Sequence, residues 1–462
     1  MIKAVRGTRD LLPPETALWQ FVESAVRDVF RAYNFQEIRT PIFESTELFA
    51  RGVGEETDIV AKEMFTWEDG RARWDTPASQ KNLETLALQL ETTLEGAKDA
   101  FQKWKDGLGL TERSQSLTLR PEATAGIVRA YIEHNLETRG LNKLYCIGPM
   151  FRRERPQKGR YRQFYQIDAE IIGPASAGSE SPARDAEVLE MLATLLDRLG
   201  IAGWNLELNS VGCPNDRAAF NEALRRALEP VVGNMCADCQ RRAVTNPLRV
   251  FDCKVPADQP IIDTLPRISQ FLDEGCRTHF EAVKEILTQV GIPFTLNDRL
   301  VRGLDYYTRT AFEFTHGALG AQNAILGGGR YDGLSEALGG PAAPGIGFAI
   351  GEDRLVMSLQ ESAPVESVLK KPDVYIAPLG GGMNAEAARL ARELRRHDVI
   401  VDLGDETFRL KKSFETASKA GAKYILIVGE DEVKAEAFAL KNLATGEQVS
   451  VPRAELARRI QE

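Results

Sequence analysis

The sequence has no long hydrophobic run. No stretch of its 462 residues approaches the ~18 uninterrupted apolar residues that a membrane-spanning helix needs. The segment from Met1 to Asp10 mixes basic and acidic residues and has no apolar centre of a secretory signal. We therefore expect no membrane segment and no secretory leader, and a cytoplasmic location.

Cysteine is scarce as well. Six cysteines are scattered along the chain, and a chain this long buries a large core without covalent staples. In the cytosol they are most simply reduced thiols without a metal. One alternative is a zinc site in which Cys236 and Cys239, spaced C-x-x-C, join Cys276 and His279. Whether these cysteines or Cys253 bind a metal stays open at this point.

An excess of positive charge is also missing. The chain has 58 basic and 67 acidic side chains and a net charge of −9, which argues against a protein that coats nucleic acid nonspecifically. A local patch can still bind a polyanion. Between Arg152 and Arg162 six basic residues face one acid, Glu154. This stretch is either a polyanion site or a solvated loop.

Hydrophobic periodicity indicates a mixed helix and sheet unit over residues 1–355. We expect helices over 13–33, 121–132 and 184–199, and strands over 37–43, 117–120, 143–150, 163–172, 205–209, 294–301 and 310–315. Pro121 favours a helix start, since proline suits the first helical turn. The pattern also predicts a polar helical insert at about 75–112 and an inserted lobe at about 213–292.

The pattern changes after a linker over 356–371. Short apolar runs at 374–377, 399–402 and 424–428 alternate with helical stretches at 384–396 and 407–420. This alternation predicts a mostly parallel βαβαβ sheet, followed by two more strands and a helix. We expect a separate α/β domain over 372–462.

Several stretches resemble known motifs. Phe35–Glu44, with Pro41, Phe151–Gln166 and Gly345–Arg354 resemble motifs 1, 2 and 3 of class II aminoacyl-tRNA synthetases. The run Val301–Thr308, which reads VRGLDYYT, resembles the signature of the histidyl-tRNA synthetase family. Leu119–Glu122 and Gly327–Gly333 also resemble that family.

The resemblance implies an α+β fold, with a six-stranded, mainly antiparallel sheet flanked by helices. It implies a homodimer built partly on motif 1 and a C-terminal anticodon-binding α/β domain. It also implies an enzyme that activates L-histidine with ATP and transfers it to tRNA(His). The alternative is a catalytically silent relative that regulates ATP phosphoribosyltransferase. The intact arginines described below and the C-terminal domain favour the enzyme, and Arg302 to Thr308 argues against a synthetase for another amino acid.

Activation brings a carboxylate to a polyphosphate. The nucleophile is already ionised, so fixed cations and positioning are needed rather than a base. The resemblance implies that Arg152 bridges the α-phosphate and the carboxylate, that Arg302 lies on its opposite side, and that Arg354 lies against the adenine. Glu154 is a further expected ATP ligand, and Mg²⁺ is expected to bridge the phosphates.

The histidine pocket follows from the hydrogen-bonding groups of imidazole. The resemblance implies that Glu170 and Tyr307 bind the two ring nitrogens and that Tyr306 shapes the wall. The remaining expected histidine contacts are Glu122, Ala123, Thr124, Arg152, Gln166 and Arg302. Arg155 and Gln157 are expected to read the tRNA acceptor end. The glycines at 327–329, 345, 347 and 351 allow close backbone approach to a ligand, allow strand crossings too tight for a side chain, or simply form turns.

Overall fold

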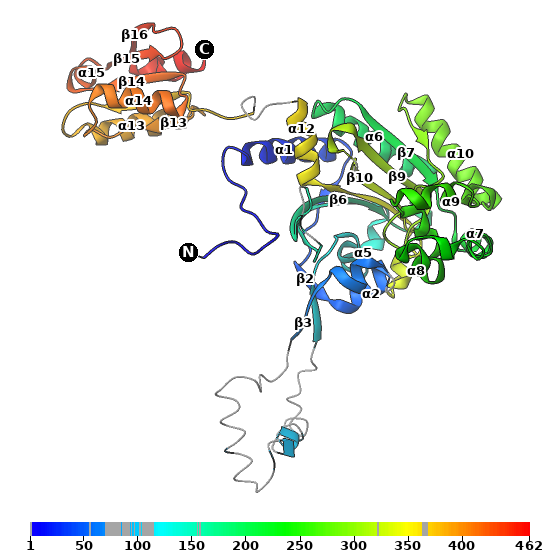
Figure 1. The fold of residues 1–462 in the computed structure, drawn as a ribbon. Helices are drawn as coiled ribbons and strands as arrows, with labels where there is room; N and C mark the ends of the chain where they lie inside the picture. Colours follow the sequence, from blue (N-terminus) through cyan, green and yellow to red (C-terminus); the bar gives the residue numbers. More distant parts are fainter. Residues whose placement is uncertain are drawn as a thin grey trace. The chain divides into compact units, whose positions relative to one another are not determined.

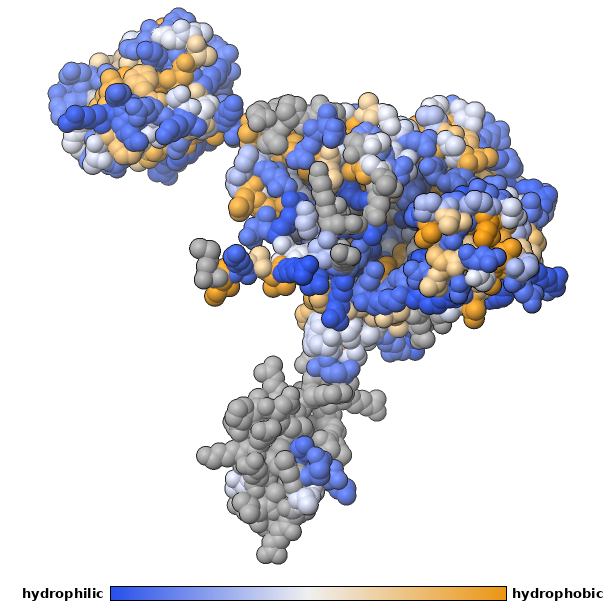
Figure 2. All heavy atoms as spheres, in the orientation of Figure 1, coloured by the Kyte–Doolittle hydropathy of each residue, from blue (hydrophilic) through white to orange (hydrophobic). Residues whose placement is uncertain are grey.

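The computed structural model describes residues 2–54, 57–69, 115–154, 156, 159–320, 323–362 and 368–462, with a few isolated positions between 85 and 103. The chain divides into two compact units, Met1–Val365 and Glu366–Glu462 (Figure 1). Most of the expected insert at 75–112 lies outside the described residues. In the described part, no helix has the length and apolar character to cross a membrane. Hydrophilic residues cover much of the surface that Figure 2 shows.

The first unit is built on a sheet whose described strands number eight. In spatial order they are β1 (Gln36–Glu37), β5 (Asn142–Phe151), β6 (Gln163–Ile172), β11 (Gly345–Gly351), β10 (Ala324–Arg330), β9 (Thr308–His316), β7 (Trp204–Ser210) and β8 (Thr295–Leu296). The six central strands pair antiparallel, whereas β1 and β8 add short parallel edges. The expected six-stranded antiparallel sheet is therefore confirmed. The strand expected over 294–301 is wrong beyond Leu296.

Helices cover one face of this sheet (Figure 1). They are α1 (Thr16–Ala32), α6 (Pro182–Arg198), α10 (Glu274–Gln289) and α12 (Glu352–Ser362). In α1 the apolar residues recur at helical spacing, so one side of the helix is buried. Phe30 of α1 contacts Phe348 of β11 edge-on, with 6.0 Å between the ring centroids. On the opposite face, the helix over Thr124–Glu133 (α5) packs against Leu144, Cys146 and Met150 of β5, next to the polar side chains of the site.

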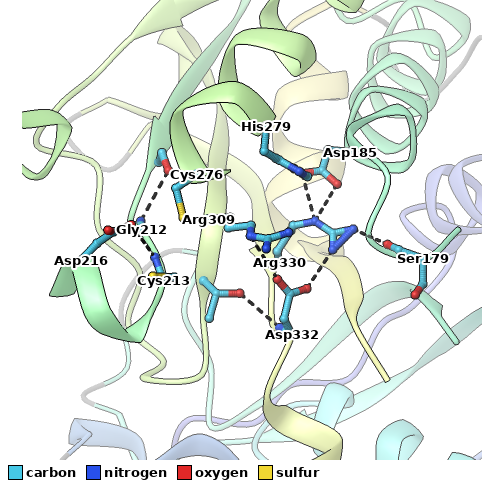
Figure 3. Close-up of polar contacts among 12 residues, drawn as sticks. Ser179, Asp185, Gly212, Cys213, Asp216, Cys276, His279, Arg309, Arg330 and Asp332 are labelled. Carbon is cyan, nitrogen blue, oxygen red and sulfur yellow. Dashed lines mark hydrogen bonds and ion pairs between the residues drawn. The ribbon is translucent and has the colours of Figure 1, made fainter. Parts of the chain in front are cut away.

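A buried ion-pair network fastens two of these helices to the sheet (Figure 3). Arg330 of β10 is fully buried, and its Nε donates to Asp185 Oδ1 of α6 at 2.9 Å. Asp185 Oδ2 lies 2.8 Å from Nε2 of His279 on α10. Asp185 thus contacts Arg330 through one oxygen and His279 through the other, and these contacts offset the cost of removing the charged groups from water. Because His279 is held by Asp185, the zinc quartet that combines it with Cys236 and Cys239 is wrong.

A second, smaller sheet contains β2 (Phe43–Ser45), β4 (Gln115–Leu119) and β3 (Phe65–Asp69), and α2 (Thr46–Val53) packs beside it. The single strand expected over 37–43 is wrong. It is divided into β1 and β2, with Pro41 between them, because proline has no N–H for a ladder. The helix expected from Pro121 is also wrong at its start, because α5 spans Thr124–Glu133.

Residues 213–292 form helices around their own apolar cluster. The α-helices are α7 (Pro214–Leu228), α8 (Ala237–Thr245) and α9 (Gln259–Asp263), followed by α10. The cluster includes Phe220, Val250, Ile262, Cys239 and Cys253. The 3-10 helix η5 (Pro247–Asp252) contacts α8. This part of the chain is called the lobe below.

The second unit has a five-stranded sheet in the described residues. Its order is β13 (Val401–Leu403), β12 (Val374–Pro378), β14 (Tyr424–Val428), β15 (Ala437–Asn442) and β16 (Gln448–Pro452). The first three strands are parallel and the last two antiparallel. The helices are α13 (Met383–Arg395), α14 (Leu410–Ala420), α15 (Glu430–Ala435) and α16 (Leu456–Gln461). The predicted βαβαβ unit with two further strands and a final helix is confirmed.

Candidate active site

Three polar side chains share one face of β6, the face on which α5 packs. Gln166, Asp168 and Glu170 alternate along the strand with Ile167 and Ala169, so they point to one side. All three are buried. Polar groups this deeply buried require partners from the protein or from a ligand.

Glu170 is the best satisfied of the three. Its Oε1 accepts a hydrogen bond from Thr124 Oγ1 at 2.7 Å, and its Oε2 accepts one from the Tyr331 hydroxyl at 2.6 Å. Complete burial raises the pKa of Glu170 to about 8, and the nearby Glu122 adds to the rise. At neutral pH and without a ligand, this carboxyl is therefore mostly protonated.

Glycines on β10 and β11 make room for these side chains. A Cβ at Gly347 would lie 1.6 Å from Glu170 Oε2. A Cβ at Gly329 would lie 2.9 Å from Cδ1 of Tyr307. The glycines therefore form a pocket floor without side chains, called the bare floor below, against which Glu170 and Tyr307 pack. The sequence left three roles open for these glycines: approach to a ligand, strand crossings too tight for a side chain, and turns. In the structure, protein groups occupy the space that the missing side chains leave.

The N-terminal end of α5 forms one wall. The carboxylate of Glu122 accepts hydrogen bonds from the amides of Thr124 at 2.8 Å and Ala125 at 2.9 Å, and Ala123 is the N-cap residue. These bonds explain why the helix begins after Pro121. Burial raises the pKa of Glu122 despite the two amides.

Tyrosines close the pocket above Glu170. The ring of Tyr306 lies 4.8 Å from that of Tyr307 and 5.9 Å from that of Tyr331, measured between centroids. Burial raises the pKa of Tyr306 well above its ordinary value, and the charges of Tyr307, Glu122 and Glu170 act in the same direction. The structure thus brings the expected Glu122, Thr124, Glu170, Tyr306 and Tyr307 together.

Two of the three expected catalytic arginines lie near the carboxylate of Glu313, and Arg302 pairs with it directly. Arg302 Nη1 donates to Glu313 Oε1 of β9 at 3.0 Å, and its guanidinium lies against the backbone of Gly327, where a Cβ would be 2.5 Å away. Arg354 Nη1 donates to the carbonyl of Ala324 at 2.6 Å. Burial lowers the pKa of Arg354, and Glu313 partly offsets this effect.

Arg152 lies at the end of β5, beside the carboxylates of β6 and α5. Its Nε donates to the carbonyl of Pro121 at 2.9 Å, and its guanidinium carbon lies 5.2 Å from the ring centroid of Phe164. Glu154 pairs with Arg160 of the same loop at 3.1 Å. Arg155 and Gln157 lie outside the described residues.

Sequence reasoning missed two residues of this site. Tyr331 lies in the quoted glycine-rich run, yet only the fold directs its hydroxyl to Glu170. The carboxylate of Asp168 is buried with no hydrogen-bond partner among the described residues. Burial raises its pKa well above the ordinary value, and Glu170 and Glu122 add to the rise. The alternation of β6 places Asp168 beside Gln166 and Glu170, and that pattern could have identified it.

A cavity of about 230 Å³ shares Arg302 and Tyr307 with this site. Its other walls come from the loop after Val301 and from the lobe. It is strongly basic, with guanidinium groups from Arg217, Arg225, Arg249 and Arg302 in its lining. The site therefore combines buried carboxylates and tyrosines on one side with cations on the other, an arrangement suited to a small zwitterion beside a polyanion.

The family model described as histidyl-tRNA synthetase matches residues 83–355, and that described as anticodon binding domain matches residues 373–462. A histidine–tRNA ligase from Koribacter versatilis (strain Ellin345) is 65% identical over 458 residues, which cover 99% of this chain and 95% of the relative. One from Solibacter usitatus (strain Ellin6076) is 54% identical over 462 residues, covering 100% and 99%. The crystal structure of apo S. aureus histidyl-tRNA synthetase is 34% identical, covers 100% of both chains and has a TM-score of 0.75.

Proposed function

The chain belongs to the histidyl-tRNA synthetase family, and we propose the roles of the residues through which it acts. It is a histidine–tRNA ligase. It activates L-histidine with ATP to histidyl-adenylate and transfers the histidyl group to the 3′ end of tRNA(His), with release of diphosphate and AMP. The relation to the histidine–tRNA ligases extends over almost the whole chain and does not favour a regulatory subunit of ATP phosphoribosyltransferase.

The buried Glu170 is the observation that carries the proposed histidine pocket. Its carboxyl accepts the imidazole N–H, and Tyr307 serves the other ring nitrogen, while Tyr306 forms the wall. Support comes from the burial of Glu170 between two hydroxyl donors and from the closely packed tyrosines. A wrong amino acid would leave these buried groups unpaired, which allows discrimination of roughly 10⁴–10⁵ without editing.

The substrate ammonium and carboxylate are held beside the imidazole. Glu122, Ala123, Thr124 and Gln166 position the ammonium end. The carbonyl oxygen of the Gln166 side chain is buried and has no hydrogen-bond partner among the described residues, so it is available as an acceptor. Asp168 lies next to it on the same face of β6. Arg152 and Arg302 hold the carboxylate against the α-phosphorus.

Arginines provide the charge stabilisation for adenylate formation. Arg152 and Arg302 bind oxygens of the α-phosphate, and Arg354 packs on the adenine. Glu154 completes the ATP contacts. In a site from which water is excluded, one such donor contributes on the order of 3–4 kcal/mol to the transition state. No general base is required, because the attacking carboxylate is ionised.

Mg²⁺ fits the residues present. Glu313 offers a carboxylate beside Arg302, close enough to Arg354 to affect its pKa, and its side chain is 24% exposed. Mg²⁺ is usually held by one or two carboxylates and substrate phosphates. When bound, it offsets charge on the diphosphate leaving group.

Binding of tRNA(His) involves both units. Residues 373–462 bind the anticodon region, and Arg155 and Gln157 read the acceptor end. Arg409, Lys411 and Lys412 lie at the start of α14 and are exposed, which suits phosphate contact. This reading competes with that of a solvated helix face.

We also propose a cytoplasmic homodimer that uses motif 1. Support comes from large apolar side chains on and beside β2 and β3. Ile42, Phe43 and Trp67 are each at least 40% exposed, and the rings of Phe43 and Trp67 pack at 5.9 Å. An exposed apolar group of this kind is typical of a protein interface.

Histidine-dependent exchange of diphosphate into ATP tests the assignment. Arg302→Ala should lower the exchange kcat by ~10²–10³-fold, because one charge-stabilising donor is lost. Histidine affinity, measured by calorimetry, should fall much less than kcat, because the proposed contacts of Glu170, Tyr307 and Glu122 to histidine remain. Arg299→Ala is the matched control, since Arg299 pairs with Asp263 at 2.8 Å outside the site. Near-normal turnover of Arg302→Ala would contradict the proposed role.

A further inference from the structure

Three thiols and a carboxylate meet inside the lobe, away from the residues assigned above. The Sγ atoms of Cys236, Cys239 and Cys253 and a carboxylate oxygen of Asp258 all lie within 4.8 Å of one another. Cys239, Cys253 and Asp258 are buried, and Cys236 is partly buried. Within the described residues, which include every cysteine of the chain, no disulfide forms. Three thiols and one carboxylate, all of them ligand types that zinc accepts, therefore share one small volume.

The spacing of these atoms suits a tetrahedral ion. Ligands at about 2.3 Å from a zinc ion lie about 3.8 Å apart along the edges of the tetrahedron. Cys236 Sγ and Cys253 Sγ are 3.9 Å apart, and Cys253 Sγ lies 3.2 Å from Asp258 Oδ2. A disulfide would need sulfur atoms about 2.05 Å apart. Small shifts of side chains would place one ion at bonding distance from all four ligands.

The local backbone also suits thiolate ligands. Cys236 is the N-cap residue of α8, and Cys239 lies in its first turn. The N-terminal end of a helix stabilises negative sulfur. The amide of Val255 donates to Cys253 Sγ at 3.4 Å, and the amide of Cys236 lies 3.2 Å from both oxygens of Asp258. Hydrogen bonds of this kind orient the ligands of metal sites.

A neighbouring cluster in the lobe has a different explanation. Cys213, Asp216, Asp273 and Cys276 also lie close together (Figure 3 labels three of them). There the carboxylates cap helices: Asp216 Oδ2 accepts from the amide of Cys213 at 3.0 Å, and Asp273 Oδ1 accepts from that of Cys276 at 2.7 Å. Only two thiols are present. This second cluster serves as an internal control for the first.

We propose that Cys236, Cys239, Cys253 and Asp258 bind one structural Zn²⁺ ion. Four protein ligands close the coordination shell, so the ion has no open position for a substrate. The lobe has a small core, and an ion that joins α8 to the end of η5 supplies a cross-link which apolar burial alone does not provide.

The ion would also stabilise the loop that carries Arg302. The catalytic consequence of this stabilisation rests on the proposed function. Cys236 and Cys253 bound the segment that contains α8 and η5. From this segment Asn246 Nδ2 donates to Asp305 Oδ1 at 2.9 Å, and Arg249 Nη1 donates to the carbonyl of Gly303 at 3.2 Å. These contacts hold Gly303 and Asp305, the first and third residues after Arg302 in the run Val301–Thr308. Release of the ion should therefore loosen the loop and lower the rate of adenylate formation.

Metal content of the full chain tests the site directly. Protein purified under reducing conditions with zinc in the medium should retain about one zinc ion per chain by mass spectrometry. Cys239→Ser and Cys253→Ser should lose it. Cys213→Ser, from the neighbouring cluster, is the matched control and should keep it. Absence of zinc from well-folded protein with free thiols, a Cys236–Cys253 disulfide in that protein, or equal loss in Cys213→Ser would overturn the proposal.

Cobalt provides a readout that needs no variant. It also covers the case in which the serine variants do not fold. Co²⁺ added to metal-depleted parent protein should give the intense thiolate-to-metal charge-transfer bands and the visible bands of a tetrahedral site. A spectrum without these bands would overturn the proposal. Diphosphate exchange is measured in parallel. Bound zinc without exchange activity would support the zinc site and refute the proposed function. Exchange activity without bound zinc would refute the zinc site and support the proposed function.

Discussion

Glu170→Gln offers a sharp test of the histidine pocket, because Glu170 is a fully buried acid whose protonation the structure perturbs. Its pKa rises from the ordinary 4.5 to about 8. The native protein therefore keeps a proton that the unfolded chain loses between these two values, and stability falls as the pH rises through this window. At about 1.4 kcal/mol per unit, the loss reaches about 5 kcal/mol above pH 8. Glutamine, which is always neutral, has no such loss.

The same substitution should weaken histidine binding. Donation by the imidazole N–H favours the carboxylate form of Glu170. Glutamine replaces this charge-assisted hydrogen bond by a neutral one, which costs about 1–2 kcal/mol. The KM for histidine should therefore rise by roughly 5–30-fold. The variant should therefore be more stable than the parent at high pH and bind histidine more weakly. Together these two results would show that Glu170 contributes to binding and lowers stability.

Denaturation at pH 5, 7 and 9 and histidine-dependent exchange kinetics measure both effects. Glu352→Gln is the matched control. Burial raises the pKa of Glu352 to about 9, with Glu23 and Asp353 adding to the rise, but Glu352 lies in the first turn of α12 and contacts no proposed substrate residue. It should change the pH dependence of stability without changing the KM for histidine. Identical pH–stability curves for Glu170→Gln and the parent would refute the reasoning.

Two further substitutions probe the surroundings of Glu170. Gly347→Ala should abolish most histidine-dependent exchange, because its Cβ would lie 1.6 Å from Glu170 Oε2, whereas Gly233→Ala, which meets open space, should leave exchange kinetics unchanged. Tyr331→Phe removes the donor to Glu170 Oε2 and should destabilise the protein by about 1–3 kcal/mol in urea unfolding. It should also raise the pKa of Glu170, so that the steep part of the pH–stability curve moves to higher pH, and an unmoved curve would argue against this contact.

The sequence was informative wherever periodicity and short motifs define structure. The strand expected over 163–172 is β6 without change, and its alternation aligns Gln166 with Glu170. Proline positions misled the element boundaries. Pro121 suits a first helical turn, but the Glu122 carboxylate binds amides two and three residues later and sets the start of α5 there.

Long-range partners lay beyond the sequence. The C-x-x-C pair was visible, yet the fold supplies Cys253 and Asp258 as its neighbours and assigns His279 to Asp185. Spacing along the chain does not identify which distant residue packs into a small core. Tyr331 illustrates the same limit, since its hydroxyl reaches Glu170 only because β10 and β6 flank β11.

The bare floor of the pocket has a consequence for how specificity can change. At Gly327, Gly329 and Gly347 any side chain would collide with a group already in place. Substitution there cannot reshape the pocket gradually, since the smallest step from hydrogen to methyl already displaces a neighbour. Engineering for imidazole analogues is therefore directed to the walls, where Tyr306 and Thr124 stand on segments outside the strands of the sheet.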